Sequence, residues 1–170
     1  MLGFLFRGLT ATPTRGAALF AALTAEARRP HWYVEGKLPD TLDGRFAVLA
    51  TVTALTLVRF ESEGEAGIPA AVALTERFIE VMESEHRELG LGDPTLGKTV
   101  RKLVAMLARR TELWRLACSG ERDWAESTRE SLYKDDADAD ALARSAKALK
   151  RLWARLQAAP LSGIEQGEIA

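Results

Sequence analysis

The segment that most resembles a known chemical site is Gly92–Thr99, which has the G-x-x-x-x-G-K-[ST] spacing of a phosphate-binding loop. In such a loop, backbone N–H groups surround the phosphates, the lysine reaches the outer phosphates and the last hydroxyl binds Mg²⁺. This chemistry needs a buried strand before the loop, whereas residues 74–90 have the pattern of a charged amphipathic helix. Pro94 also removes one backbone donor. A helix–turn–helix corner explains the same residues, so nucleotide binding stands only as an alternative function.

A second pattern imitates the start of a calcium-binding loop. Asp136, Asp138 and Asp140 have the right spacing, but Ala141 stands where the loop needs glycine and Lys147 where it needs a bidentate glutamate. Acidic residues near the beginning of a helix are favoured by the helix dipole, which explains the run without a metal ion.

The histidines and the cysteine do not form a metal site or a catalytic pair. Glu83 and His86 make one Glu-x-x-His motif, whereas a di-iron site needs a second copy and bridging carboxylates. His31 and Cys118 have no partners at metal-site spacing, and the sequence has no Gly-x-Ser-x-Gly nucleophile motif. We therefore expect no metal, no cofactor and no catalytic residue.

Four basic residues lie on one face of the helix expected after Pro94, opposite its apolar face: Lys98, Arg101, Lys102 and Arg109. Such a face can bind an acidic protein, RNA or lipid phosphates. A charged stripe opposite a buried one is also typical of any surface helix. Both interpretations remain open, and a helical adaptor for RNA or anionic lipid is a second alternative function.

Apolar residues recur at helical spacing along most of the chain, which predicts an all-α, single-domain bundle of about six helices. The β-branched residues at 46–58 make a strand the competing interpretation there, but the length of the run and its lack of turn residues favour a helix. The expected helices run from Thr14 or Gly16 to about Arg29, from an Asp43 cap to about Glu61, from the break at 63–69 to about Leu89, from Pro94 to Gly120, from Glu121 to Leu132, and from the acidic run at 135–140 to Pro160.

The rest of the chain is expected to connect or flank these helices. Residues 31–46 form an aromatic connector rich in turn residues, which Trp32 and Tyr33 are expected to anchor to the core. We predict a flexible segment at 1–13, a helical domain at 14–158 and a loose tail at 159–170. Glu85 falls on an apolar helix face, so it is expected to be exposed in the last turn or to have a cationic partner. The buried faces are expected to hold Leu74, Phe78, Val81 and Met82, then Leu96, Val100, Leu103, Val104, Leu107 and Trp114, then Leu142, Leu149, Leu152, Trp153 and Leu156.

Composition and charge narrow the function classes further. The 170 residues carry 23 Lys and Arg against 24 Asp and Glu, which argues against a basic coat for DNA. One cysteine cannot form an internal disulfide. The longest apolar run, Phe46–Val58, is too short to cross a bilayer. The apolar start has no basic residue before Arg7, which argues against a secretory signal. Arg7 and Arg15 weakly suggest an organelle transit peptide, but a segment that rests on the domain or on a lipid surface is favoured.

Two separated blocks carry a more specific signal. In the first, a Pro-Asp-Thr-x-x-Gly-Arg-Phe run leads into the apolar helix, and in the second an Arg-Glu-x-Gly-x-Gly-Asp turn precedes the basic helix. The matching residues are Pro39, Asp40, Thr41, Gly44, Arg45 and Phe46, then Arg87, Glu88, Gly90, Gly92, Asp93 and Lys98. From about Ala17 to Trp114, this pattern resembles the ubiquinol–cytochrome c chaperone family. Three features depart from the family pattern: the apolar helix has no His, Phe60 follows Arg59 in place of a second Arg, and Leu107–Arg110 replaces an aromatic-Gly-Arg stretch.

The resemblance implies an all-helical assembly factor, not an enzyme, that holds newly made cytochrome b on its way into the ubiquinol–cytochrome c reductase complex. Other assembly factors or the ribosome are further expected partners. The implied location is the cytoplasm, peripheral to the inner membrane, with the matrix side of the mitochondrion as the alternative. The connector and the basic corner are the candidate partner surface, which comprises Trp32, Tyr33, Asp40, Arg45, Arg87, Asp93, Lys98, Arg101 and Lys102.

Overall fold

The computed structural model describes residues 15–88, 93–133 and 137–169, and for residues 86–88 and 93–96 it describes the backbone alone. These residues form helices and connecting turns, with no strand among them. The elements are α1 (Ala17–Ala27), α2 (His31–Val34), α3 (Leu42–Glu61), the 3₁₀ helix η1 (Gly64–Gly67), α4 (Ile68–Glu88), α5 (Asp93–Ser119), α6 (Trp124–Leu132), α7 (Ala139–Ala158) and α8 (Leu161–Glu165). The predicted all-α bundle is confirmed. The six expected helices correspond to α1 and α3–α7, whereas α2 and α8 were not expected.

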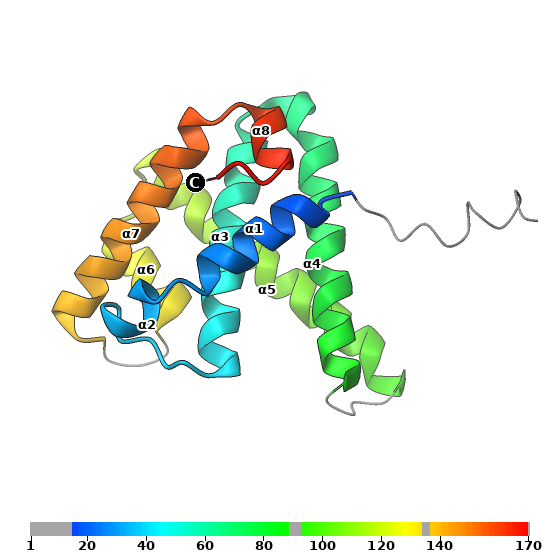
Figure 1. Cartoon of the computed structure of the whole chain (residues 1–170), viewed down its shortest axis with the longest axis horizontal. Coiled ribbons are helices and arrows are strands. Elements are labelled where there is room, and N and C mark those ends of the chain that lie inside the picture. Colours follow the sequence, from blue (N-terminus) through cyan, green and yellow to red (C-terminus); the bar gives the residue numbers. More distant parts are fainter. Residues whose placement is uncertain (1–14, 89–92, 134–136, 170) are drawn as a thin grey trace, which may run out of the picture.

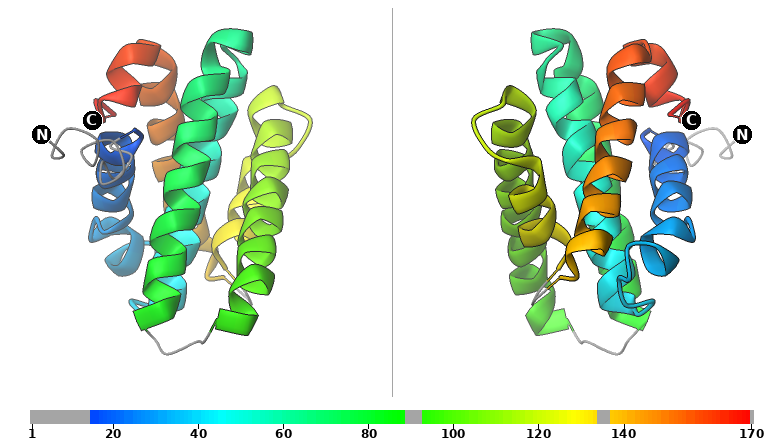
Figure 2. Two further views of the ribbon diagram at one scale, coloured as in Figure 1. Left: turned by 90° about the vertical axis from the view of Figure 1, so that its right-hand side faces the viewer. Right: turned by 90° about the vertical axis from the view of Figure 1, so that its left-hand side faces the viewer.

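Helix α3 lies at the centre of the bundle and contacts α1, α4, α5, α6 and α7 (Figure 1). Helices α5 and α6 cover one side of the bundle, and α1 and α8 cover the other (Figure 2). Every residue of α3 from Val48 to Phe60 is buried. An apolar run that neighbours surround on all sides needs no amphipathic pattern, which is why its β-branched residues are accommodated in a helix. The competing interpretation of this run as a strand is wrong.

The start of α3 differs from the sequence prediction. Thr41 has an extended backbone and is the N-cap residue, and its side chain accepts a hydrogen bond from the Gly44 N–H at 3.2 Å. Asp43, which was predicted to be the cap, lies in the first turn instead. A threonine two residues earlier provides the same capping chemistry, so sequence alone placed the helix start two residues too late.

The apolar faces are largely as predicted. Among the predicted core positions, those that are at least nine-tenths buried are Leu74, Phe78, Met82, Leu103, Leu107, Trp114, Leu142, Leu149, Leu152 and Leu156. Val81, Val100 and Trp153 are part-buried, and Leu96 lies outside the described side chains. Val104 is 42% exposed because it lines an open groove between α4 and α5, so its predicted burial is wrong. Glu85 is exposed at the end of α4, which resolves its position on the apolar face.

The C-terminal residues pack on the domain. Helix α8 buries Ile164 completely, and Ile169 is only 5% exposed. Gly167 has φ 86°, and a Cβ at this position would lie 2.9 Å from the Ala18 carbonyl oxygen of α1. The expectation of a loose tail is therefore wrong for residues 161–169, because two isoleucines give this short segment enough apolar surface to bury. No helix in the described ranges is long and apolar enough to span a membrane.

Candidate functional site

The two sequence blocks that carry the family resemblance lie at one end of the molecule. Helix α3 begins there, and α4 ends and α5 begins there as well (Figures 1 and 2). We define the motif end as residues 34–46 together with residues 97–102. Segments more than fifty residues apart in the sequence thus contribute to one surface, as expected of a composite binding site.

The first block folds as a tightly closed cap. A Cβ on Gly44 would lie 1.9 Å from the Pro39 carbonyl oxygen, so only glycine fits beneath that carbonyl. The Arg45 guanidinium donates a hydrogen bond from Nε to Asp40 at 2.7 Å, and this bond lowers the pKa of the Asp40 carboxyl group. The geometry of the cap therefore explains four motif residues, and Asp40 and Arg45 alone among them extend charged groups into solvent.

The two connector aromatics have different surroundings. Trp32 is completely buried, and its Nε1–H donates to the Glu26 carbonyl oxygen at 2.9 Å. The expectation that Trp32 contributes to a partner surface is therefore wrong, because the side chain anchors α2 to the core. Tyr33 is part-exposed, and its hydroxyl donates to the Ala27 carbonyl oxygen at 2.6 Å. Burial of the ring is the main cause of the raised pKa of Tyr33, and nearby Asp40 adds to it.

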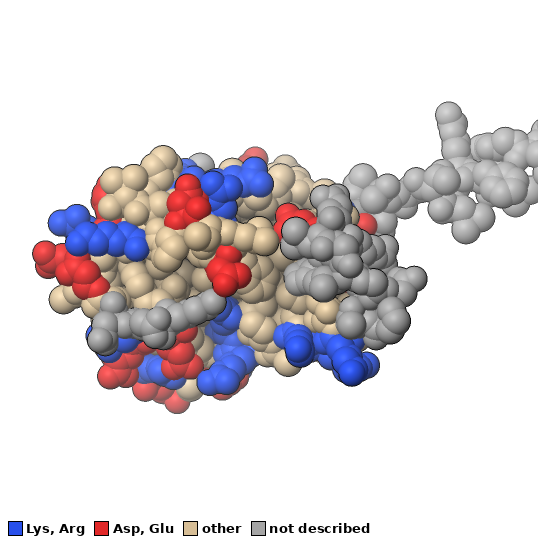
Figure 3. Space-filling view, turned by 90° about the horizontal axis from the view of Figure 1, so that it is seen from below, with Lys and Arg blue, Asp and Glu red and all other residues tan. Residues whose placement is uncertain are grey.

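Two exposed apolar side chains flank the connector, and sequence reasoning missed both. Val34 is 74% exposed at the end of α2, and Leu42 is 61% exposed at the start of α3. Seen from below, the middle of this face is largely uncharged with an acidic side chain in it, and lysines and arginines lie toward its edges (Figure 3). Short apolar segments beside turns have no periodicity to mark them as exposed, which is why the sequence gave no signal.

The basic residues of α5 are placed as the helical pattern predicts. Lys98, Arg101 and Lys102 are exposed on the first turns of the helix. Arg109 is also exposed and lies 3.7 Å from Glu130 of α6. The side chains of Arg87 and Asp93 lie outside the described residues, so their assignment stays a prediction.

A large groove runs from the connector along α6 to α5, with a volume of about 1170 Å³. Sequence reasoning missed most of its lining. Lys37, which has φ 52°, pairs with Asp138 at 2.6 Å, and the Tyr133 hydroxyl donates to the Gly36 carbonyl oxygen at 2.6 Å. The groove is lined by Lys37, Leu38, Pro39, Thr41, Asp43, Gly44, Ala47, Arg110, Arg122, Glu126, Arg129, Glu130, Ser131, Leu132 and Tyr133.

A second groove of about 430 Å³ adjoins the first on the α5 side. The two grooves share Arg110, Glu130 and Ser131, and Ala105, Met106 and Leu113 add apolar surface to the smaller one. Ser131 is held in place because its Oγ hydrogen-bonds Thr51 of α3 at 2.6 Å and accepts from Trp114 Nε1 at 3.2 Å. Hydrogen bonds to α3 and α5 therefore hold Ser131 in position where the two grooves meet.

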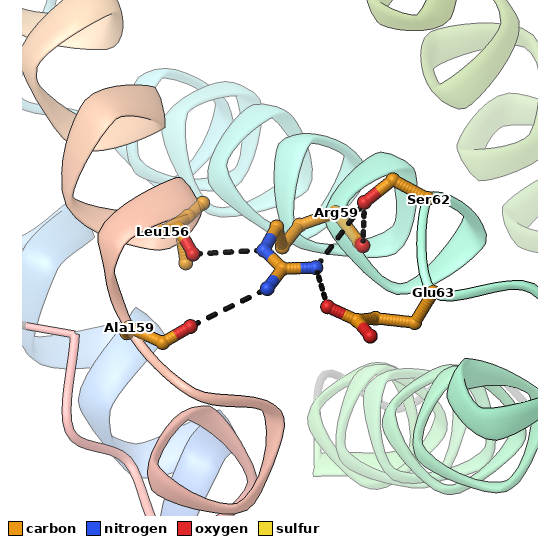
Figure 4. A network of polar contacts seen from close by, with 5 residues as sticks. All are labelled: Arg59, Ser62, Glu63, Leu156 and Ala159. Carbon is orange, nitrogen blue, oxygen red and sulfur yellow. Dashed lines mark hydrogen bonds and ion pairs between the residues drawn. The ribbon is translucent and has the colours of Figure 1, made fainter.

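The arginine at this junction is incompletely satisfied. Arg110 Nη2 donates to the Ser131 carbonyl oxygen at 3.3 Å, and Nε is buried without a hydrogen-bond partner. Burial, and secondarily the neighbouring Arg109, lower the pKa of Arg110. The buried Arg59 of α3 differs: it donates to the carbonyl oxygens of Leu156 and Ala159 and to Ser62, and it pairs with Glu63 (Figure 4).

The fold does not support the phosphate-binding alternative. Helix α4 precedes the segment in place of a strand, and residues 93–99 are the first turns of α5. A helical backbone cannot form the cradle of N–H groups, so nucleotide binding through this segment is wrong. Among the described residues, no group of three His, Cys, Asp or Glu side chains has the geometry to hold a metal ion. Burial raises the pKa of Cys118 to about 12, which leaves this thiol unreactive at neutral pH.

Comparison with known proteins extends the resemblance beyond the two blocks. The model of a family described as "Ubiquinol-cytochrome C chaperone" matches residues 34–170. The match therefore begins later than the expected start at Ala17 and continues past Trp114 to the end of the chain. Among curated proteins, no sequence matches this chain. The crystal structure of the Cbp3 homolog from Brucella abortus superposes with a TM-score of 0.77 and 24% sequence identity, covering 100% of this chain and 96% of that one. At this identity, the likeness shows the fold alone.

Proposed function

The chain belongs to the ubiquinol–cytochrome c chaperone family, and we propose that it binds newly made cytochrome b and holds it for assembly into the ubiquinol–cytochrome c reductase complex. In this role the chain is a binding protein without catalysis, located in the cytoplasm and peripheral to the inner membrane. Other assembly factors and the ribosome are proposed as further contacts. Family membership supports the general role of an assembly chaperone, and the identity of the client is our own step.

The observation that carries the proposal is the composition of the motif end. A subunit that is only partly inserted exposes apolar segments beside charged loops. The motif end offers matching chemistry, because Val34 and Leu42 are exposed apolar side chains and Lys98, Arg101 and Lys102 are exposed cations. Apolar contacts of this kind provide affinity, and the surrounding charges orient the partner.

A gene deletion tests the biological role. Without the protein, we expect the assembled complex to decrease while synthesis of cytochrome b, followed by pulse labelling, stays unchanged. Unchanged levels of the assembled complex would overturn the proposal. Loss of cytochrome b synthesis itself would also contradict it, because a holding chaperone acts after translation.

Site-specific cross-linking tests the surface. A photo-reactive residue at Leu42 or Arg101 is expected to capture cytochrome b, identified by mass spectrometry of the cross-linked product. Glu65 in η1 is the matched control, because it is exposed at the opposite end of the molecule. Capture of cytochrome b from Glu65 as efficiently as from Leu42 would refute the motif end as the binding surface.

A further inference from the structure

Arg110 is an arginine whose charge the described part of the fold does not neutralise. Three arginines there have a buried Nε without a hydrogen-bond partner: Arg77, Arg110 and Arg155. Arg77 and Arg155 each hold a carboxylate through another nitrogen, Glu80 at 2.8 Å and Glu26 at 2.9 Å. Arg110, by contrast, has no carboxylate within 4.0 Å among the described residues and makes one long hydrogen bond to a carbonyl oxygen.

The carboxylates of the groove do not compensate for this. Glu130 is the acidic residue that both grooves share, and it is engaged by Arg122 at 2.5 Å and by Arg109 at 3.7 Å. Glu126 also lines the larger groove, and among the described residues it lies outside ion-pair distance of Arg110. A part-buried guanidinium without a counter-charge among the described residues is unfavourable, so its retention calls for a bound partner that supplies one.

We propose that Arg110 binds the carboxylate of an acidic side chain within an apolar segment of a bound polypeptide. A guanidinium can bind a carboxylate through two parallel hydrogen bonds, and here the Nη groups, which make one hydrogen bond among the described residues, remain for that purpose, whereas Nε is buried. Ala105, Met106 and Leu113 give the adjoining groove an apolar wall for the residues beside the acidic one.

The surroundings of Arg110 favour a carboxylate over a lipid phosphate. Arg110 lies in a recess between α5 and α6, whereas the exposed cations Lys98, Arg101 and Lys102 lie on an open helix face. The grooves carry both signs of charge, with Glu126 and Glu130 among Arg109, Arg122 and Arg129, so Arg110 offers a fork for one carboxylate rather than an open cationic face for a multiply charged headgroup. A peptide with one acidic side chain therefore fits both the shape and the charge of the site.

Designed peptides test this inference, which rests on the proposed role of holding client segments. The probes are short leucine–alanine peptides with lysine-rich ends and a central Glu, Gln or Lys, labelled for fluorescence anisotropy with the full-length protein. The Glu peptide is expected to bind about tenfold tighter than the Gln peptide, the difference that a charge-assisted bidentate hydrogen bond provides. Arg110→Gln is expected to remove this preference, and Arg110→Glu to transfer it to the Lys peptide.

Arg144→Gln is the matched control, because it removes the same charge from an exposed position of α7 that lies outside both grooves and outside the motif end. It should leave the preference for the Glu peptide unchanged. Arg110→Lys retains the charge without the planar fork and should keep only part of the preference, and this variant tests the inference if Arg110→Gln does not fold.

The inference is overturned if the unmodified protein binds Glu and Gln peptides equally, or if Arg110→Gln keeps the preference. Loss of binding to phosphatidylglycerol vesicles in Arg110→Gln, with peptide binding intact, would overturn it in favour of lipid phosphate. Because the peptides derive from no client, none of these outcomes bears on the identity of cytochrome b as the client.

Discussion

Arg59 and Arg110 differ in how well the fold satisfies their guanidinium groups. Arg59 is buried, and Arg110 is part-buried. Arg59 joins the end of α3 to the end of α7, where its donors reach two carbonyl oxygens, a hydroxyl group and a carboxylate (Figure 4). Arg110 lies where α5 meets α6, and its Nε has no partner. In the first region the donors of the arginine have partners within the chain, whereas the second region is open to solvent through two grooves.

The difference separates residues that hold the fold together from residues that are available for binding. A satisfied buried arginine stabilises the folded chain, because its removal leaves several acceptors without donors. An unsatisfied one reduces stability, and such residues persist where a bound partner supplies the missing interaction. Substitution of the two arginines by the same residue should therefore change stability in different directions.

The largest effect is expected for Arg59→Met. The substitution leaves Glu63 and the carbonyl oxygens of Leu156 and Ala159 without their donor, and it loosens the attachment of α7 to α3. We expect the free energy of unfolding to fall by about 3 kcal/mol and the melting temperature to fall by roughly 6–12 °C. Denaturant and thermal unfolding followed by circular dichroism measure both quantities.

Arg115→Met is the control for this substitution. Arg115 pairs with Glu61 at 2.8 Å on an exposed face, where a salt bridge contributes at most about 1 kcal/mol. If both variants lost the same stability, the network around Arg59 would have no special role in the fold.

The next effect concerns Gly44, which lies in the wall of the larger groove. In Gly44→Ala the new methyl group would overlap the Pro39 carbonyl oxygen, so the backbone of the cap must move. We expect a loss of about 2 kcal/mol. Gly97→Ala is the matched control, because the nearest atom is Arg101 Nη1 at 3.9 Å and alanine favours the helix by about 0.5–1 kcal/mol. Equal changes for both alanine variants in urea unfolding would show that the cap does not restrict position 44.

A smaller effect of opposite sign is expected for Arg110→Met. The substitution removes an uncompensated charge and only one long hydrogen bond. Stability should stay unchanged or rise by up to about 1 kcal/mol, because a thioether side chain suits the apolar surroundings. The same unfolding measurements that follow Arg59→Met decide the matter, and a loss comparable to that of Arg59→Met would mean that Arg110 is a structural residue.

The sequence predicted the fold more completely than the site, for physical reasons that individual residues show. The helical spacing of Leu149, Leu152 and Leu156 predicts their burial, because periodicity in a helix determines which face meets the core. The same logic placed Lys98 and Arg101 on the exposed face. Ile164 and Ile169 were missed because a segment this short has no measurable period, although it packs on α1.

Spacing along the chain could not predict which side chains meet across helices. The groove at Arg110 combines residues from the connector, α5 and α6, and Tyr133 contacts Gly36 across 97 positions of the sequence. Asp40 and Arg45 of the first motif were predicted as partner contacts, whereas the structure gives the neighbouring Thr41 and Gly44 a local role in starting α3. A family motif thus marks a constrained position, and geometry is needed to tell a cap from a contact.

The smallest expected effect is the pH dependence that His31 of α2 contributes to the free energy of unfolding. The imidazole of His31 stacks against the indole of Trp32, with ring centroids 4.4 Å apart. Burial is the main cause of a pKa below the ordinary value of 6.5, and charged neighbours modify it in both directions: Glu26, Arg29, Glu35 and Arg151. As the pH falls through about 6.5, the unfolded chain binds a proton that the folded chain does not yet bind, so this contribution to stability is lost toward the lower folded-state pKa. Because the ring is part-exposed, solvent reduces the effect, and we expect no more than about 0.5 kcal/mol between roughly pH 7 and pH 5.

His31→Gln should lose less stability over this range than the unmodified protein in urea unfolding. If the variant lost more stability, the imidazolium would be favoured in the folded state, and the attraction of Glu26 and Glu35 would outweigh the cost of burial.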